Sequence, residues 1–342
     1  MHSSGFHQMV VRDANAYLPG DYIYNPNGKP TILAPRPDPN LGIVQQFYPQ
    51  AVFNENQVIV NFNSRFTQNF SVFGFYTASW ANSDGGGGSN PSNSYNLRQD
   101  YGRAAWVHPQ WMLLVGNYSG PWGLSFNPFM IVRAGNPYNV HSPYDLTGDN
   151  FFNDRPSFAT SSTPIDSNVV QTSFGALNVI PQSNESIIPV SIGNGPSAVA
   201  FNLRIGRYIG IGPKVQSNGG PMPGMGGGGG PHGGHGHGGF GGPFGGPMGP
   251  GRGPHGLGGM DNTGRKYSLN FNVQALNLFN NINLGTPHGG IVPTRNCTNS
   301  SDPSTCTYGP GPEFGQSTGL AGGIFSTASA ARRIFFQMAF QF

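Results

Sequence analysis

Charged residues are scarce in this sequence, and so are long apolar runs. Aspartate, glutamate, lysine and arginine make up 9% of its 342 residues, against about 25% in typical soluble domains. No stretch approaches the ~18–20 consecutive apolar residues of a membrane-spanning helix. The net charge of +3 is too small and too scattered to predict a nucleic-acid partner. These shortages leave open a closed β-barrel, whose alternating strands average to neutral hydropathy.

Catalytic and secretion motifs are missing as well. H-E-x-x-H does not occur, and the acidic residues stand apart from one another, so we predict that the chain is not an enzyme. The first residues contain no basic segment followed by an apolar one, so no signal peptide is visible there.

Cysteine is nearly absent. The two cysteines, Cys297 and Cys306, lie nine positions apart in a short polar segment. They can close a disulfide, which implies an oxidising compartment, or they can remain free thiols in a reducing one. No metal-ligand partners lie near them at zinc spacing. We therefore predict the disulfide.

Strict alternation of apolar and other residues marks the end of the chain. The large apolar side chains recur at every second position, at Ile334, Phe336, Met338, Phe340 and Phe342. A period of two predicts a strand whose two faces meet different surroundings.

Similar alternation predicts an all-β, antiparallel fold without long amphipathic helices. We expect eight strands, near 41–49, 57–66, 69–80, 108–118, 123–134, 198–210, 265–279 and 331–342. Each is close to the ~9–11 residues that a tilted strand needs to cross the hydrocarbon layer. The polar face of these strands is expected to line a lumen, with Asn61, Asn63, Arg133, Arg204, Asn270, Asn272 and Gln274. The pattern predicts a section of a transmembrane β-barrel.

The gaps between the predicted strands are unequal. Two are tight turns, at 66–69 and 119–123, and three are long, at 81–107, 135–197 and 281–330. Outer-membrane barrels have short periplasmic turns and long external loops. If the C-terminus is periplasmic, the three long gaps are external and both tight turns are periplasmic. The Gly/His-rich segment 211–264 is the exception, and we predict a periplasmic loop without regular structure there.

Two segments contain candidate metal ligands. Asp145, Thr147, Asp149 and Asn153 occupy alternating positions of a calcium-loop pattern, and Asp154 is the candidate for the acidic ligand at its end. The pattern lacks the turn glycine, and Pro156 stands where the bidentate acid belongs, so a loop of Asx-turns within 145–156 is the alternative. In the Gly-rich segment, His232, His235 and His237 have spacings that can gather around Cu²⁺, Ni²⁺ or Zn²⁺, or they are polar residues of an unstructured chain.

Several motifs, taken in order, resemble a known family. They are NLRQDYGRAAW (96–106), GPWGLSFNPFMIVRAGNPYNV (120–140), DLTGDNFFNDRPSFA (145–159), YSLNFNVQALNLFNNIN (267–283), FGQSTGLAGG (314–323) and RRIFFQMAFQF (332–342). They resemble the C-terminal half of TonB-dependent receptors of the Oar-like kind, which carry a carboxypeptidase-regulatory-like domain before plug and barrel. The closing pattern of Phe336, Met338, Phe340 and Phe342 resembles the signal by which outer-membrane barrels are recognised for insertion.

The resemblance implies energised uptake of a scarce ligand across the outer membrane of a Gram-negative bacterium. It implies outer-membrane lipid, the barrel-assembly machinery and, in an intact receptor, a TonB-type energising complex as partners. Such a receptor has a signal sequence, a TonB-interacting segment, a plug and 22 strands, whereas this sequence shows about eight strands and none of the other parts. The resemblance therefore implies a C-terminal section, and it does not imply transport by this section alone.

We divide the chain into an irregular segment, 1–40, and a barrel section, 41–342. A closed eight-stranded barrel would require 41–49 to pair with 331–342, but 41–49 alternates poorly and ends at Pro49, which cannot donate to a ladder. An open section of a larger barrel is therefore favoured. A surface or secreted β-rich structural or adhesion protein is the alternative function.

Overall fold

The computed structural model describes residues 1–19, 22–24, 30–32, 35–85, 90–149, 151–164, 166–214, 265–298, 306–325 and 330–342. The all-β, antiparallel prediction is confirmed. The helical elements of these ranges include the short 3-10 turns η2 (Leu97–Asp100), η3 (Pro121–Gly123) and η5 (Gly323–Phe325).

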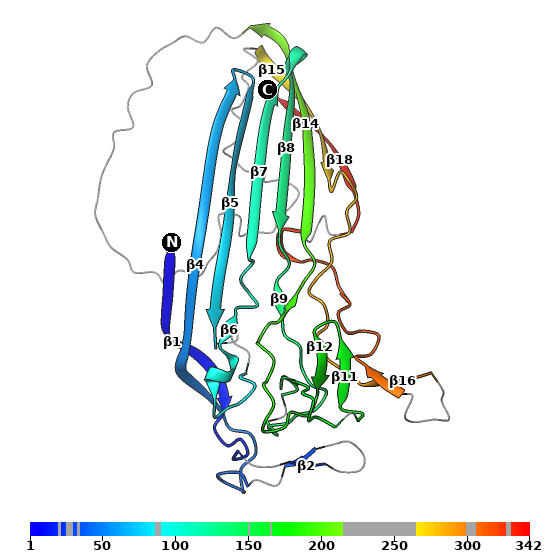
Figure 1. The fold of residues 1–342 in the computed structure, drawn as a ribbon. Coiled ribbons are helices and arrows are strands. Elements are labelled where there is room, and N and C mark those ends of the chain that lie inside the picture. Colours follow the sequence, from blue (N-terminus) through cyan, green and yellow to red (C-terminus); the bar gives the residue numbers. More distant parts are fainter. Residues whose placement is uncertain are drawn as a thin grey trace, which may run out of the picture.

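Nine of the described strands form one sheet in which strand order follows chain order (Figure 1). Its eight long strands are β1 (His2–Asp13), β4 (Gln45–Thr67), β5 (Phe70–Ser83), β7 (Gln110–Ser119), β8 (Leu124–Arg133), β14 (Ala198–Lys214), β15 (Arg265–Leu276) and β18 (Arg333–Gln341). All neighbouring pairs are antiparallel, and the short β6 (Gly102–Arg103) pairs with β5.

Two of the predicted strand boundaries are wrong. Residues 45–49 and 57–66 belong to a single strand, β4, because the residues between them continue the ladders with β1 and β5. Pro49 lies opposite Met9, next to a register shift, where irregular pairing tolerates a residue without an N–H. The segment 1–40, expected to be irregular, contains β1. The number of long strands is still eight, but only because these two errors offset each other.

The tight turns lie at one end of the sheet, and the long connections other than the one from β14 to β15 lie at the opposite end. The β4–β5 and β7–β8 turns and the C-terminus lie at the upper end in Figure 1, and the β1–β4, β5–β7, β8–β14 and β15–β18 connections lie at the lower end. In the second turn the backbone of Trp122 (φ 59°) and Gly123 (φ 69°) turns through the left-handed region, which glycine adopts without steric cost. The Gly/His-rich stretch begins later than predicted, because β14 continues to Lys214. Residues 215–264, with His232, His235 and His237, lie outside the described residues.

The long connections form a layer with its own core. Five short strands make a second sheet, namely β10 (Ser157–Phe158), β12 (Gly175–Asn178), β11 (Val169–Thr172), β17 (Cys306–Gly309) and β16 (Thr294–Cys297). Two further pairs are β9 (Pro137–Tyr138) with β13 (Gly193–Asn194), and β2 (Tyr22–Tyr24) with β3 (Pro30–Ile32). The buried core of the layer is made of Tyr138, Val140, Leu146, Val170, Leu177, Val179, Ile180, Ile188 and Ile291.

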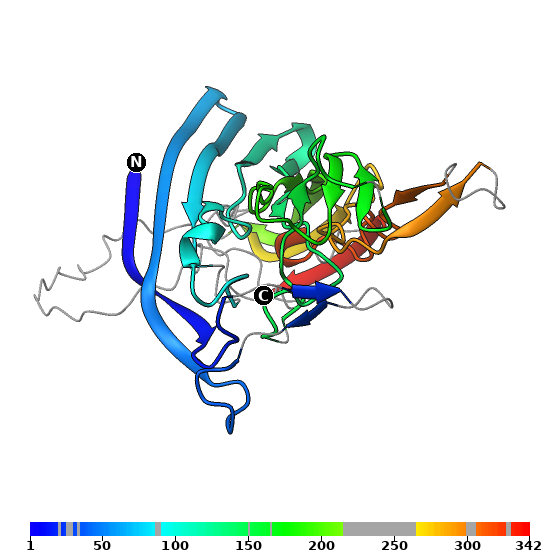
Figure 2. The same ribbon diagram turned by 60° about the horizontal axis from the view of Figure 1, so that its bottom comes forward.

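The large sheet is open. In the described part of the chain, β1 and β18 are the two ends of the strand order and do not pair with each other. Figure 2 shows the sheet bending from β1 and β4 on one side of the loop layer round to β18 on the other.

Candidate functional site

One face of the large sheet is apolar across seven adjacent strands. Cross-strand pairing places Phe336 beside Val273, Val273 beside Ile205 and Ile205 beside Phe126. By the same register, the face gathers Val58, Val60, Phe62, Tyr76, Met112, Leu114, Phe126, Met130, Val132, Phe201, Leu203, Ile205, Leu269, Phe271, Val273, Ile334, Phe336, Met338 and Phe340. We call this set the apolar face.

Side chains of the apolar face are exposed on β4 and β18 and half-buried on the strands β5, β7, β8 and β14 between them. Phe336 is 82% exposed, Met338 68% and Val60 51%. Neither of the hydrophobic cores found among the described residues includes a residue of this face. A soluble domain rarely leaves a contiguous apolar surface of this extent uncovered. The face is therefore available to a surrounding apolar medium.

The residues predicted to line a lumen lie on the opposite face. Asn61 and Asn63 lie on β4, Arg133 on β8 and Arg204 on β14, and β15 contributes Asn270, Asn272 and Gln274. Some of these side chains bond to one another. Arg204 donates through Nε to Asn272 Oδ1 (3.1 Å), and Asn272 donates through Nδ2 to Asn270 Oδ1 (3.0 Å). We call these seven residues the polar row. Their function as a channel lining stays a prediction.

An apolar cover lies over the loop end of this polar face. Phe325 of η5 is fully buried, and it packs with Ala321 against Leu113, Ile131, Ala198 and Ala200 of the sheet. The guanidinium of Arg133 lies 4.7 Å from the centre of the Phe325 ring. Arg133 therefore lies under a loop. The sequence shows no periodic signal for this cover, because its residues come from one short turn.

A buried ion pair joins two of the long connections. Arg155, 3% exposed, donates through Nη2 to Asp100 Oδ1 at 2.9 Å and through both Nη atoms to the backbone carbonyls of Ile188 and Gln99. Asp100 also accepts from the backbone N–H (2.7 Å) and hydroxyl (2.6 Å) of Ser92. Removing one partner of such a pair leaves a buried charge uncompensated, so this pair fixes the two connections relative to each other.

The candidate calcium loop is built of Asx-turns. Asp145 Oδ1 accepts from the N–H groups of Gly148 (2.7 Å) and Asp149 (3.2 Å), and Asp149 Oδ1 accepts from Phe151 N–H (2.9 Å). Asp154 Oδ2 accepts from the N–H groups of Leu146 and Thr147. These carboxylates thus satisfy the loop's own backbone, which matches the alternative to calcium.

Metal binding by this loop stays a prediction. Asn153 donates through Nδ2 to the carbonyl of Asn90 (2.9 Å), and within the described ranges no three His, Cys, Asp or Glu side chains are placed to hold a metal. Burial raises the pKa of Asp154 to about 8 and that of Asp149 to about 6, because desolvation disfavours their charged forms.

The remaining predicted residues lie on strands. Cys297 and Cys306 form a disulfide that joins β16 to β17. On the last strand the rings of Phe340 and Phe342 stack at 6.3 Å, and Phe340 stacks on Tyr267 at 5.9 Å. The recognition of this strand by assembly machinery stays a prediction.

Comparisons with known proteins identify no relative. No family model, curated protein or solved structure matches the chain. In the part of the chain that the structure describes, no helix has the length and apolar character to cross a membrane.

Proposed function

We propose that this chain is a section of an outer-membrane β-barrel of the TonB-dependent receptor kind. The observation that carries the proposal is the exposed apolar face, which extends over seven adjacent strands while the loop layer and the polar row occupy the other face and one end. In water an exposed apolar face carries a free-energy cost. In hydrocarbon this cost is absent, so the face needs no covering by protein.

Strand direction supports the same arrangement. The two short turns lie at the end where the chain terminates, and four long connections lie at the other end; the exception is 215–264, which joins β14 to β15 at the turn end. This is the asymmetry of outer-membrane barrels, with short turns on the periplasmic side and long loops outside. The proposed partners are outer-membrane lipid, the barrel-assembly machinery and, in a complete receptor, a TonB-type energising complex. The proposed activity is uptake of a scarce ligand, with the polar row lining the passage around a plug.

The apolar face is tested by labelling neighbouring positions on one strand. Val60 and Ile59 lie on opposite faces of β4, and their exposed fractions are nearly equal, 51% and 47%. The native cysteines are joined to each other, so a fluorophore on Val60→Cys or Ile59→Cys reports one position. In vesicles that contain nitroxide-labelled lipid, we expect strong quenching at position 60 and weak quenching at position 59.

Two outcomes would count against the proposal. Equal quenching at both positions would refute the assignment of the lipid-facing surface. A chain that stays in buffer and does not bind the vesicles would favour the alternative, a surface or secreted β-rich structural or adhesion protein. Because the two positions match in size, polarity and exposure, a difference between them reports lipid contact.

A further inference from the structure

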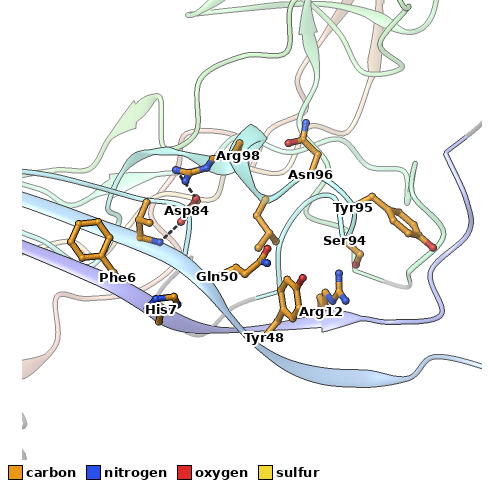
Figure 3. A pocket seen from close by; sticks show the side chains of 12 residues that line it. Phe6, His7, Arg12, Tyr48, Gln50, Asp84, Ser94, Tyr95, Asn96 and Arg98 are labelled. Atoms are coloured by element: carbon orange, nitrogen blue, oxygen red, sulfur yellow. Dashed lines mark hydrogen bonds and ion pairs between the residues drawn. The ribbon is translucent and has the colours of Figure 1, made fainter.

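A cavity of about 490 Å³ lies at the loop end of the sheet, between β1, β4 and the segment that leads into η2 (Figure 3). Its lining includes Phe6, His7, Arg12, Tyr48, Asp84 and Arg98. Ligand pockets of small molecules have volumes of about 300–1,000 Å³. The cavity is lined by aromatic rings and by charges of both signs, and neither the polar row nor the apolar face includes these residues.

Two irregularities in the β1–β4 ladder shape the cavity. The register shifts between Gly5 and Gln8 and again between Gln8 and Met9, so each strand contributes one extra residue within a short distance. His7 takes a left-handed backbone conformation (φ 55°) in the first of them. Bulges re-aim side chains and occur next to binding sites, and a strained backbone persists only where its surroundings hold it. Here the two bulges lie at His7 and Gln50, and both residues line the cavity.

Asp84 supplies an incompletely satisfied acceptor. The residue is 2% exposed, and its Oδ1 accepts from Val52 N–H at 2.6 Å. Its Oδ2 is buried and makes no hydrogen bond to the described residues; it lies 3.6 Å from Nη1 of Arg98, whose side chain is 69% exposed. An exposed arginine at this distance stabilises a carboxylate little. A ligand with a cationic N–H group would donate a hydrogen bond to Asp84 Oδ2 and displace Arg98.

Arg12 supplies the complementary donor. Its guanidinium lies 3.8 Å from the centre of the Tyr48 ring, and its Nη2 donates to Gln46 Oε1 at 3.3 Å. Its Nε is buried and has no hydrogen-bond partner in the part of the chain that the structure describes. A guanidinium held against an aromatic ring keeps a fixed orientation and binds carboxylates well. The cavity thus holds a carboxylate with one oxygen that accepts no hydrogen bond and a guanidinium whose Nε donates none among the described residues.

We propose that this cavity binds a small zwitterion of the amino-acid or short-peptide class. The ligand's ammonium group bonds Asp84 Oδ2, its carboxylate bonds Arg12 and the released Arg98, and an apolar side chain packs on Phe6, which is 69% exposed. A purely anionic ligand would face the buried Asp84 carboxylate, and a neutral sugar would leave both charges unmatched. The proposal does not rest on the proposed membrane function, because none of the lining residues belongs to the apolar face or to the polar row.

Calorimetry on the folded full chain tests the proposal, in detergent if the chain is a membrane protein and in buffer if it is not. The probe is the dipeptide alanyl-phenylalanine, with its N-acetyl derivative and maltose as comparison ligands. We expect the dipeptide to bind, the N-acetyl derivative to bind about tenfold more weakly or worse, and maltose not to bind.

Variants locate the site. Asp84→Asn keeps an acceptor for Val52 N–H and should weaken dipeptide binding about tenfold. Arg332→Gln, next to the opposite edge strand β18, is the matched control and should leave binding unchanged. If Asp84→Asn does not fold, the comparison of the free and acetylated dipeptides on the wild-type chain still decides. Absence of dipeptide binding, equal binding of the acetylated form, or preference for maltose would each overturn the proposal.

Discussion

Met338 and Gln337 are neighbours on β18 whose side chains lie on opposite faces of the sheet. Lysine at Met338 would place a charge in hydrocarbon if the apolar face meets lipid. We expect Met338→Lys to lower the free energy of unfolding by ~2–4 kcal/mol if the site is near the bilayer midplane. Urea unfolding in lipid vesicles measures the change, and Gln337→Lys is the matched control. Equal effects of the two lysines would contradict the assignment of the faces.

Asp154 makes the stability of the loop layer depend on pH. Burial raises its pKa to about 8 in the folded chain, against about 3.9 in an unfolded one. Between these values the folded state holds a proton that the unfolded state has lost, so this contribution to stability is complete below about pH 4 and declines as pH rises through about 8. Asp149, raised to about 6, adds to the lower part of that range.

We therefore expect Asp154→Asn to remove most of the decline between about pH 6 and pH 8, because asparagine stays neutral and keeps an acceptor for Leu146 N–H. Limited proteolysis of the loop layer at several pH values measures it. Asp166→Asn, at an exposed residue of the same connection, is the control. A decline that persists unchanged in Asp154→Asn would show that another group causes it.

At the scale of elements, η5 acts as a cover for the sheet through a single buried ring. We expect Phe325→Ala to destabilise the packing of 320–325 by ~3–5 kcal/mol, because the ring is fully buried over Leu113 and Ile131. Hydrogen exchange should show faster exchange at Ala321 N–H, which donates to the carbonyl of Asn283, with little change in β7 and β8. Leu320→Ala, at a residue 52% exposed, is the matched control. Unchanged exchange in the Phe325 variant would refute the cover.

The β16–β17 hairpin is closed by the disulfide of Cys297 and Cys306. Thiol labelling of the denatured, unreduced chain should give no signal at either cysteine, and reduction should expose both. A disulfide stabilises by typically ~2–4 kcal/mol, mainly by restricting the unfolded chain. Since this hairpin belongs to the loop layer, we expect the double Cys→Ser variant to loosen the pairing of β16 with β17 and to leave β15 and β18 paired. Stoichiometric labelling without reductant would contradict an oxidised loop.

Long strands were predictable because their alternation is a local property of the sequence, as in 265–276 and 333–341. The short strands of the loop layer were not, since two to four residues carry no usable period and their pairing depends on partners such as Val170 and Tyr308, far apart in the chain. For β1 the local pattern is weak, because small and polar residues occur on both faces of His2–Gln8. The formation of β1 as a strand depends on its pairing with β4.

At the scale of the whole molecule, the two-faced character of the sheet follows from alternation alone. The polar row and the apolar face can both be predicted from residues such as Asn270 and Phe271, which follow each other on β15 and lie on opposite faces of the sheet. The cavity at Asp84 could not be predicted, because it joins β1, β4 and η2 through two register shifts that leave no mark in composition. The Phe325 cover over Arg133 likewise depends on tertiary contact.

Because strand order follows chain order, the sheet also limits which insertions and deletions of strands can be tolerated during evolution. Among the described long strands of the large sheet, each pairs with its predecessor and its successor along the chain. Gaining or losing a whole hairpin therefore leaves every other connection at its original end. Gaining or losing one strand would carry all upstream connections, with the Asp84 cavity, to the opposite end. Duplication and deletion in such genes should therefore be tolerated in units of two strands.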